Sequence, residues 1–328
     1  MKRLGWWSAI AGLALAAALF ARTNIREIAA LVVAAGFGLI IASLFHVVPM
    51  AVNAVAWRRL LPPSQRVGVR AFVRAIWLRE SVNGLLPVAR VGGEVVAYRM
   101  LRPEGARRSD VAASLVADMA LSVLSQVVFA LLGLALLLAV HRDSEAATEL
   151  TIAVASMIPL GAGVVWVQRT AVLSNVVRWL DRVLLGRLRS TLDSSLRLDD
   201  ALRSIYARRR DVAASFAWQL AAWIVGSGEV WLALHFLDRP SSVFDAIAIE
   251  AFVQAASSAA FFMPAALGIQ EGAFVLIGAA LGFDATTSLA LASARRLRDV
   301  IIFFPGLIAW QWAERRDAAG DVHVRNLR

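Results

Sequence analysis

Long apolar runs alternate with short polar stretches along the chain, and these runs set the predicted architecture. Each run approaches the ~20 residues that a helix needs to cross a bilayer. We therefore predict an all-α integral membrane protein, a polytopic helical bundle of about six full spans. The spans are expected at residues 4–21, 28–56, 110–140, 149–167, 212–236 and 285–312.

Two further apolar regions, 71–101 and 246–282, carry a proline and glycines near their middle. Proline ends a helix because it lacks a backbone donor, and glycine allows the chain to reverse. We predict two re-entrant or broken helical hairpins in inverted orientation. Two pairs of full spans are the alternative, since either arrangement returns the chain to the same side of the membrane.

Hydrophobic residues recur at helical spacing between positions 172 and 206, where arginine and aspartate fill other positions. This pattern predicts an amphipathic helix on the cytoplasmic membrane surface, with an ordinary cytoplasmic helical hairpin as the alternative. Residues 1–312 are then a single transmembrane domain that includes the surface helix 172–206. Residues 313–328 are a short cytoplasmic tail.

Loop charge gives the predicted orientation. The chain of 328 residues has a formal net charge of +10 and is 59% hydrophobic. Arginines are concentrated between Arg58 and Arg108 and between Arg169 and Arg210, whereas the loops that alternate with these stretches lean acidic. Basic loops stay on the cytoplasmic side, so we expect both termini in the cytoplasm and the protein in the bacterial inner membrane. The absence of cysteine excludes disulfide and thiolate sites.

The segments "LLPVARVGGEVV" and "FMPAALGIQEGA" share one spacing: Glu94 follows Pro87 by seven residues, as Glu271 follows Pro264. Because the two copies start from opposite sides of the membrane, they form a candidate inverted repeat. Paired broken helices of this kind build substrate sites near the midplane of transporters. A proline-kinked pair of ordinary spans is the alternative. The predicted hairpin residues are Pro87, Gly92, Gly93, Pro264, Gly268 and Gly272.

Four charged residues lie about midway along the last predicted span: Arg295, Arg296, Arg298 and Asp299. Each charge at the bilayer centre costs roughly 2.5–3.5 kcal/mol on insertion scales, so these side chains should face protein or water. A self-neutralising cluster, or a helix end at the interface, is the structural alternative. We favour a functional cationic site that faces Glu94 or Glu271. Arginine's planar fork suits phosphate oxygens, so arginines near the broken helices suggest a phosphorylated, anionic headgroup as cargo.

The candidate substrate-binding residues combine side chains that would hold an anionic headgroup with carboxylates that would balance the charge. They are Asn83, Arg90, Glu94, Arg99, Asp118, Glu271, Arg295, Arg298 and Asp299. Asp118 belongs to a polar stripe along its helix that should face the bundle interior, formed with Ser114, Ser122, Ser125 and Gln126. Glu229 and Glu250 are weaker candidates, because either can be a satisfied interior carboxylate. The four histidines are scattered, so we predict no catalytic residue, metal site or cofactor.

The first hairpin has the pattern N-x-x-x-P-x-x-R-x-G-G-E-x-x-x-x-R, formed by Asn83, Pro87, Arg90, Gly92, Gly93, Glu94 and Arg99. It resembles a region of the lysylphosphatidylglycerol synthase transmembrane, or flippase-like, family. The stretch "PAALGIQEG" resembles the family's second region, although many relatives have glycines where this chain has Ala265 and Ala266. The stretches "WLRESVNGLLP" and "RRLRD" look most like the hopanoid-associated (HpnL) branch.

The resemblance implies lipid translocation, since related domains are thought to flip aminoacylated phosphatidylglycerol or polyprenyl-phosphate-linked cargo. We expect a flippase or transporter for an anionic phospholipid or polyprenyl-phosphate-type lipid, linked to hopanoid or envelope lipid metabolism. The expected partners are the bilayer, a lipid with an anionic headgroup and lipid-biosynthesis enzymes, and no nucleic acid. Two alternatives stay open: a membrane-embedded lipid-modifying enzyme that uses Glu94 or Asp118, and a non-catalytic partner of a lipid-synthesis complex.

Overall fold

The computed structural model describes residues 25–65, 67–86, 92–140, 189–259 and 266–325, and these residues form helices and connecting segments without any strand. The all-α prediction is confirmed over this part of the chain. Two of the predicted spans, 4–21 and 149–167, lie outside it. The first part of the predicted surface helix, up to residue 188, lies outside it as well.

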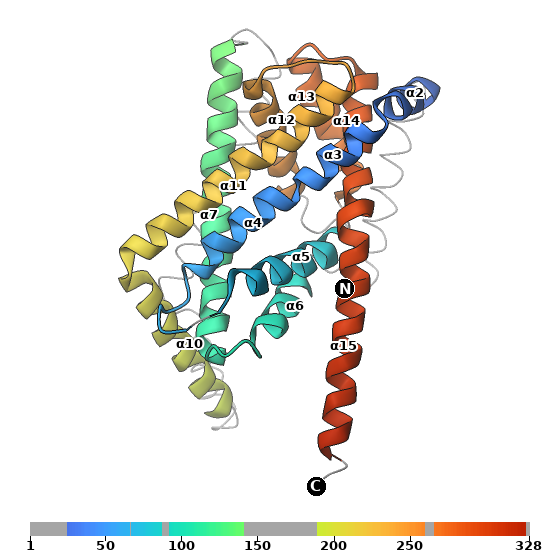
Figure 1. Cartoon of the computed structure of the whole chain (residues 1–328). Helices are drawn as coiled ribbons and strands as arrows, with labels where there is room; N and C mark the ends of the chain where they lie inside the picture. The colour runs from blue at the N-terminus through green and yellow to red at the C-terminus, as the bar shows by residue number, and fades with distance from the viewer. Residues whose placement is uncertain (1–24, 66, 87–91, 141–188, 260–265, 326–328) are drawn as a thin grey trace.

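The described helices are shown in Figure 1. Their bounds are α2 Ile25–Ala35, α3 Phe37–Phe45, α4 Val47–Arg58, α5 Val69–Leu85, α6 Gly92–Leu101, α7 Arg108–Val140, α10 Arg189–Ala207, α11 Arg209–Phe236, α12 Val243–Ala259, α13 Ile269–Ala280, α14 Ala285–Arg298, η2 Asp299–Phe303 and α15 Phe304–Arg325. The predicted span 28–56 is thus divided into three helices, at Gly36 and at His46.

Two described helices are long and apolar enough to cross a membrane by length and composition. One is Phe37–Arg58, which combines α3 and α4, and the other is Arg108–Ala139 within α7. α11 covers the predicted span 212–236, and α14, η2 and α15 cover 285–312. The total of about six spans stays a prediction.

Two helical hairpins, α5–α6 and α12–α13, lie in opposite halves of the molecule (Figure 1). The two helices of each hairpin pack against each other. α6 and α13 have only 10 and 12 residues, which is about 15–18 Å of helix and well short of the ~30 Å hydrocarbon core. These lengths suit re-entrant helices, an interpretation that stays a prediction. Pro87 and Pro264, the predicted helix breakers, lie outside the described residues.

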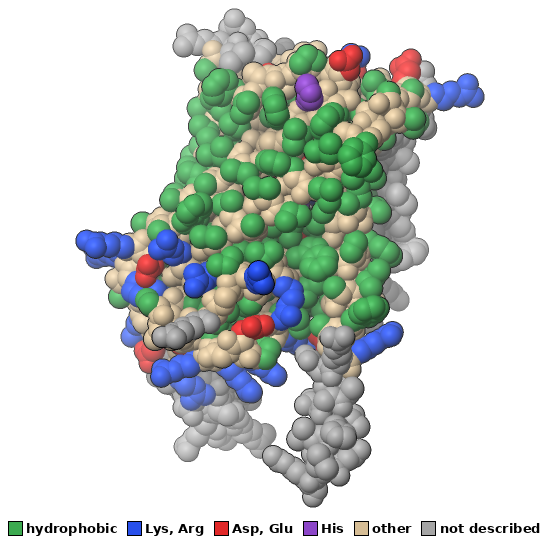
Figure 2. All heavy atoms as spheres, in the orientation of Figure 1, with side chains coloured by type: hydrophobic (Ala, Val, Ile, Leu, Met, Phe, Trp, Pro, Cys, Tyr) green, Lys and Arg blue, Asp and Glu red, His purple; other side chains and the backbone are tan. Residues whose placement is uncertain are grey.

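The two ends of the molecule differ in charge. The first end, which we call the basic end, has exposed arginines where α4, α6 and α10 lead into the next helix: Arg58, Arg59, Arg70, Arg74, Arg102, Arg107, Arg108, Arg209 and Arg210. The opposite, acidic end has Arg26, Glu27, Asp238, Arg239, Asp245 and Asp284. Figure 2 shows a broad band of hydrophobic side chains between charged ends. The α5–α6 hairpin starts and finishes at the basic end and α12–α13 at the acidic end, so the two run in opposite directions.

Polar contacts join the helices at each end. At the basic end, Arg208 donates to the backbone carbonyl of Leu60 at 2.6 Å, which fixes the start of α11 beside the end of α4. At the acidic end, Arg239 donates to the hydroxyl of Thr287 at 3.4 Å, which fixes the α11–α12 connection beside α14. α10, the described part of the predicted surface helix, packs against α7 at the basic end.

The last predicted span is interrupted by five residues of π-helix, η2, which separate α14 from α15. Such π-turns are rare and occur frequently at functional sites. Trp77 of α5 donates its indole N–H to the carbonyl of Ile302 at 2.7 Å, so the first hairpin is tied to this break. α15 continues to Arg325, so the predicted tail 313–328 is largely helical.

Candidate functional site

A cluster of charged side chains is buried where α3, α5, α11 and the α14–η2 junction meet. Arg298 is 7% exposed and lies between two carboxylates, 2.5 Å from Asp299 and 3.3 Å from Glu229. Its guanidinium also lies over the ring of Phe303, 5.1 Å from the centroid. Asp299 is the first residue of η2 and receives a second arginine contact, from Arg296 at 3.4 Å.

His46 extends this cluster toward the first hairpin. Its Nδ1 lies 2.8 Å from Glu229, and its Nε2 lies 3.3 Å from Glu80 of α5. An ionised carboxylate only accepts hydrogen bonds, and both imidazole nitrogens donate only in the protonated ring. The geometry therefore needs one proton beyond neutral histidine and two carboxylates. That proton belongs either to the imidazolium or to one of the two glutamates.

The second hairpin brings two more carboxylates to α14. Arg295 is 3% exposed, forms an ion pair with Glu250 of α12, and lies over the ring of Phe274. Arg296 donates to one oxygen of Glu271 at 2.7 and 3.0 Å. The other oxygen of Glu271 accepts the backbone N–H of Gly268 at 2.7 Å and so caps α13. We call these residues, with the Arg298–His46 cluster, the α14 network.

A separate group surrounds Arg79 of the first hairpin, and we call it the Arg79 network. Arg79 lies 2.8 Å from Asp118 of α7 and 3.7 Å from Glu94 of α6. Its guanidinium is also 5.3 Å from the ring centroid of Trp57. Gln219 of α11 donates to the second oxygen of Asp118 at 2.8 Å. Side chains from four other helices thus surround Arg79, which is half-buried.

The two networks contain more acids than bases among the described residues. The acids are Glu80, Glu94, Asp118, Glu229, Glu250, Glu271 and Asp299, and the bases are His46, Arg79, Arg295, Arg296 and Arg298. Burying an unbalanced charge is costly. Protons, or a cationic group, are therefore required in these networks whenever all four arginines are charged.

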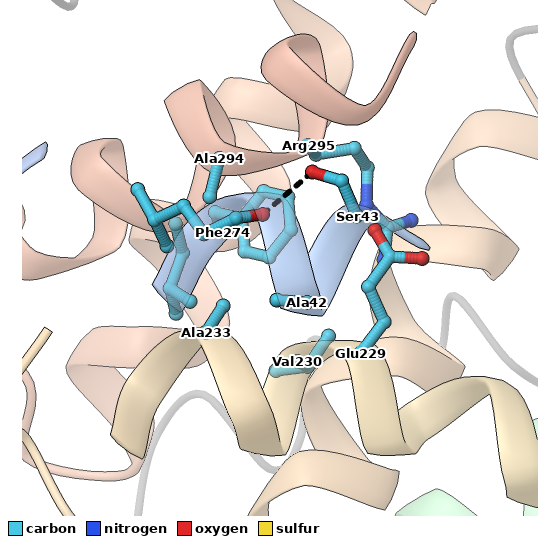
Figure 3. Close-up of a pocket in the computed structure, with 10 residues that line it drawn as sticks. Ala42, Ser43, Glu229, Val230, Ala233, Phe274, Ala294 and Arg295 are labelled. Atoms are coloured by element: carbon cyan, nitrogen blue, oxygen red, sulfur yellow. Dashed lines mark hydrogen bonds between the residues drawn. The ribbon is translucent and has the colours of Figure 1, made fainter. Parts of the chain in front are cut away.

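Figure 3 shows a small cavity beside the α14 network, enclosed by α3, α11, α13 and α14. Glu229, Arg295 and Ser43 lie together on one side of it, and Phe274 and Val230 give it apolar walls. Its volume is about 10 Å³, which is room for about one water molecule. A lipid headgroup enters this space only if the surrounding helices move apart.

The sequence matches the lysylphosphatidylglycerol synthase transmembrane region over residues 6–306. The chain belongs to this family. Neither the curated proteins nor the solved structures gave a match. Membership supports a membrane location and a lipid-related function, and it fits the apolar helices of the described structure. The hopanoid-associated branch stays a prediction.

Most of the carboxylates and arginines predicted as substrate-binding lie in the two networks. Glu94 and Asp118 lie in the Arg79 network. Glu271, Arg295, Arg298 and Asp299 lie in the α14 network. Arg90 lies outside the described residues. The basic partners of Asp299 are Arg296 and Arg298, whereas Arg295 pairs with Glu250 of α12.

Two members of the predicted set have other surroundings. Arg99 lies at the basic end, where it is exposed and pairs with Glu314 of α15 at 3.1 Å. Asn83 accepts the backbone N–H of Gly93 at 2.9 Å. This bond joins the two arms of the first hairpin, and a side chain at Gly93 would come within 2.6 Å of Asn83. The family glycine at this position therefore permits close packing of the arms.

The other hairpin glycines lie where α6 and α13, the second arms of the hairpins, begin. Gly92 is the first residue of α6. Gly268 precedes α13 with φ +76°, a conformation that favours glycine. Gly272 donates its N–H to the carbonyl of Gly268 at 2.9 Å and thus closes the first turn of α13.

Three contributors to the networks were not predicted: His46, Arg79 and Glu80. Each had a sequence signal, since a charged or polar side chain interrupts an apolar stretch and needs a partner. His46 is the only titratable side chain in the run 37–57. Its partners come from α5 and α11 and are distant in sequence. Glu229 and Glu250, predicted as weaker candidates, contact Arg298 and Arg295 respectively.

Proposed function

We propose that this family member moves a lipid with an anionic, phosphorylated headgroup, either a phospholipid or a polyprenyl-phosphate-type lipid, across the bacterial inner membrane. The observation that carries the proposal is the burial of two charge networks between hairpins that enter from opposite ends. The basic end would face the cytoplasm, because arginine-rich loops stay on that side. Both termini would lie there.

The cost of intramembrane charge supports a transport site. Each charge at the bilayer centre costs roughly 2.5–3.5 kcal/mol on insertion scales, so charged groups inside membranes are mostly retained for function. Arginine's planar fork binds phosphate and carboxylate oxygens in the same way. A phosphate group could therefore replace Glu229 at Arg298, or Glu94 at Arg79, without leaving either arginine unpaired.

Displaced carboxylates need a proton, and the described residues of the networks already include more acids than bases. In our proposal, Glu229 or Glu94 takes up a proton when the headgroup displaces it and releases that proton when the headgroup leaves. His46, which contacts both Glu229 and Glu80, would relay the proton between α11 and the first hairpin. Transport would then be coupled to proton movement and would involve no chemical change of the lipid.

Access would alternate through movement of the hairpins. The cavity beside Arg295 has a volume of about 10 Å³ and is lined by α3, α11, α13 and α14, so cargo binding there requires the α12–α13 hairpin to separate from these neighbours. The π-turn η2 begins with Asp299 of the α14 network and contacts α5, the helix of Arg79, through Trp77. A change of this turn to regular α-helix would rotate α15 relative to α14, which gives one route for coupling.

Lipid exchange in liposomes tests the proposal. The purified full chain is reconstituted with fluorescent phosphatidylglycerol, phosphatidylethanolamine or a polyprenyl phosphate, and exchange between leaflets is followed. We expect Glu94→Gln and Arg298→Ala to slow exchange about tenfold or more, since each removes a charge-assisted contact. Arg99→Gln is the matched control, because Arg99 lies outside both networks, and it should exchange lipid at the wild-type rate.

The outcomes separate the proposal from its alternatives. Exchange of one anionic lipid that depends on both network residues supports transport. Unchanged exchange in Glu94→Gln and Arg298→Ala contradicts the proposed site. If folded wild-type protein exchanges none of the lipids but converts one to a product, the protein is a lipid-modifying enzyme. A link to hopanoid or envelope lipid metabolism is part of the proposal and rests on the family resemblance.

A further inference from the structure

A groove at the basic end is distinct from both charge networks. It lies between α7, α10 and α11 and has a volume of about 750 Å³, within the roughly 300–1,000 Å³ of typical ligand pockets. The proposed transport path assigns no role to it. Three features of its lining point to a ligand of defined chemistry: a buried acid, two exposed bases and an apolar floor.

The buried acid is Asp199 of α10. It is 8% exposed, lines the groove, and its Oδ2 has no hydrogen-bond partner among the described residues. Buried carboxylate oxygens are nearly always hydrogen-bonded, because a buried charge without a partner is unfavourable. A ligand with a hydrogen-bond donor, and preferably a positive charge, would satisfy this oxygen.

The two bases are Arg203 and Arg209, which line the same groove and are exposed. Arg203 lies one helical turn after Asp199 on α10, so both side chains lie on the same face of the helix. Arg209 is the first residue of α11. Two guanidinium groups beside one carboxylate make a site that is complementary to a phosphate linked to a nearby cation.

The floor of the groove is apolar. Leu121 of α7 and Leu202 of α10 are 6% and 8% exposed, and Phe216 of α11 lies beside them. Figure 2 shows arginines gathered at this end of the molecule below the hydrophobic band. A ligand in the groove would thus have its charged part among arginines and its apolar part against leucine and phenylalanine.

We propose that this groove binds a membrane phospholipid whose headgroup carries both a phosphate and a primary amine, the chemistry of phosphatidylethanolamine. The amine would donate to Asp199, the phosphate would accept from Arg203 and Arg209, and the first acyl methylenes would contact Leu121 and Phe216. A lipid without an amine leaves Asp199 unsatisfied. The quaternary trimethylammonium of phosphatidylcholine has no N–H and cannot donate a hydrogen bond to it. The inference does not depend on whether the protein transports lipid.

Native mass spectrometry of the full chain in detergent measures this binding directly. The protein is titrated with phosphatidylethanolamine, phosphatidylglycerol or phosphatidylcholine of the same acyl chains. Water-soluble glycerophosphoethanolamine is the fourth ligand and distinguishes a headgroup from a whole lipid. We expect phosphatidylethanolamine to bind about tenfold more tightly than the other two lipids, and the soluble headgroup to bind more weakly than the lipid.

Two pairs of variants locate the site. Asp199→Asn should abolish the preference for phosphatidylethanolamine, whereas Asp200→Asn, a change at the exposed neighbouring acid, should keep it. Ala213→Trp fills the groove and should reduce binding of every lipid, and Ala217→Trp, outside the lining on the same helix, should not. Equal binding of the three lipids by wild-type protein, or a preference that survives Asp199→Asn, overturns the inference. The latter result would place the bound lipid at another site.

Discussion

The two hairpins share one plan but differ in how tightly their glutamates are held. Glu94 and Glu271 each occupy the third helical position of the second arm. Glu271 accepts from Gly268 and from Arg296, all at 3.0 Å or less. Glu94 lies 3.7 Å from Arg79, and its Oε2 has no hydrogen-bond partner among the described residues.

The two hairpins also differ in which side of an ion pair carries the positive charge. The pair in question joins the first arm of each hairpin to the helix that follows the hairpin. In the first hairpin the arginine is on the arm, Arg79, and the acid is on the later helix, Asp118. In the second, the acid is on the arm, Glu250, and the arginine is on the later helix, Arg295. Asp118 follows Glu94 by the same number of residues as Arg295 follows Glu271.

The comparison indicates a division of roles between the halves. Each half holds one ion pair between the first arm and the helix that follows the hairpin, so the pair itself fixes an arm to its neighbour whichever side carries the positive charge. The glutamate of the second hairpin is satisfied by its own helix and by α14, whereas that of the first is incompletely satisfied. We therefore expect the first hairpin to respond to cargo and the second to hold the bundle together.

The largest expected effect is on the ion pair of the second half. Arg295→Ala leaves Glu250 buried without its arginine, and we expect the free energy of unfolding to fall by about 3–5 kcal/mol. Denaturant titration of the detergent-purified protein measures the loss. Most of the stability should return in the double variant Arg295→Met with Glu250→Met, because two apolar side chains of similar size leave no unpaired charge.

The control for this prediction is an exposed ion pair. Arg74 pairs with Glu104 at 3.0 Å, but its side chain is 53% exposed. Surface pairs of this kind contribute about 0–1 kcal/mol, so Arg74→Ala should change stability by no more than that. If Arg295→Ala is as mild as Arg74→Ala, the buried pair does not fix α12 to α14, and the division of roles fails.

The next effect compares the two glutamates directly. Glu271→Gln leaves one acceptor oxygen in place of two, so an amide NH2 group faces either Arg296 or the N–H of Gly268. We therefore expect the free energy of unfolding to fall by about 1.5–3 kcal/mol. Glu94→Gln loses one distant ion pair and should change stability by less than about 1 kcal/mol, while lipid exchange falls. Equal losses of stability in the two variants would show that the hairpins are held alike.

The sequence predicted the repeat but not its partners, for physical reasons. Proline, glycine and glutamate at fixed spacing set the local geometry of a broken helix, so Glu94 and Glu271 were recognisable in each copy. The partners come from elsewhere in the chain: α5, α11 and α14 meet only after the bundle packs. Thus the connection from Glu80 through His46 to Glu229 could not be derived from spacing.

Helix geometry alone separates Arg99 from the site of Glu94. Arg99 lies five residues after Glu94 on α6, which is about 7 Å along the helix axis and on a different face. An arginine at that distance is carried to the end of a ten-residue helix rather than to the site of the glutamate. The structure accordingly places it at the basic end beside Glu314.

The smallest effect concerns the turn of the second hairpin, where this chain has alanine and many relatives have glycine. Ala266 has φ +47°, in the left-handed region. That conformation costs about 1–2 kcal/mol for a residue with a Cβ, whereas glycine adds roughly 0.5–1 kcal/mol of unfolded-state entropy. We therefore expect Ala266→Gly to stabilise the protein by about 0.5 kcal/mol in the same titration.

Two controls have the opposite sign: Gly268→Ala, at φ +76°, and Ala279→Gly, on the exposed face of α13, should both destabilise the protein. A loss of stability in Ala266→Gly would mean that the alanine side chain supports the turn. The second hairpin would then owe its rigidity to this methyl group as well as to Glu271.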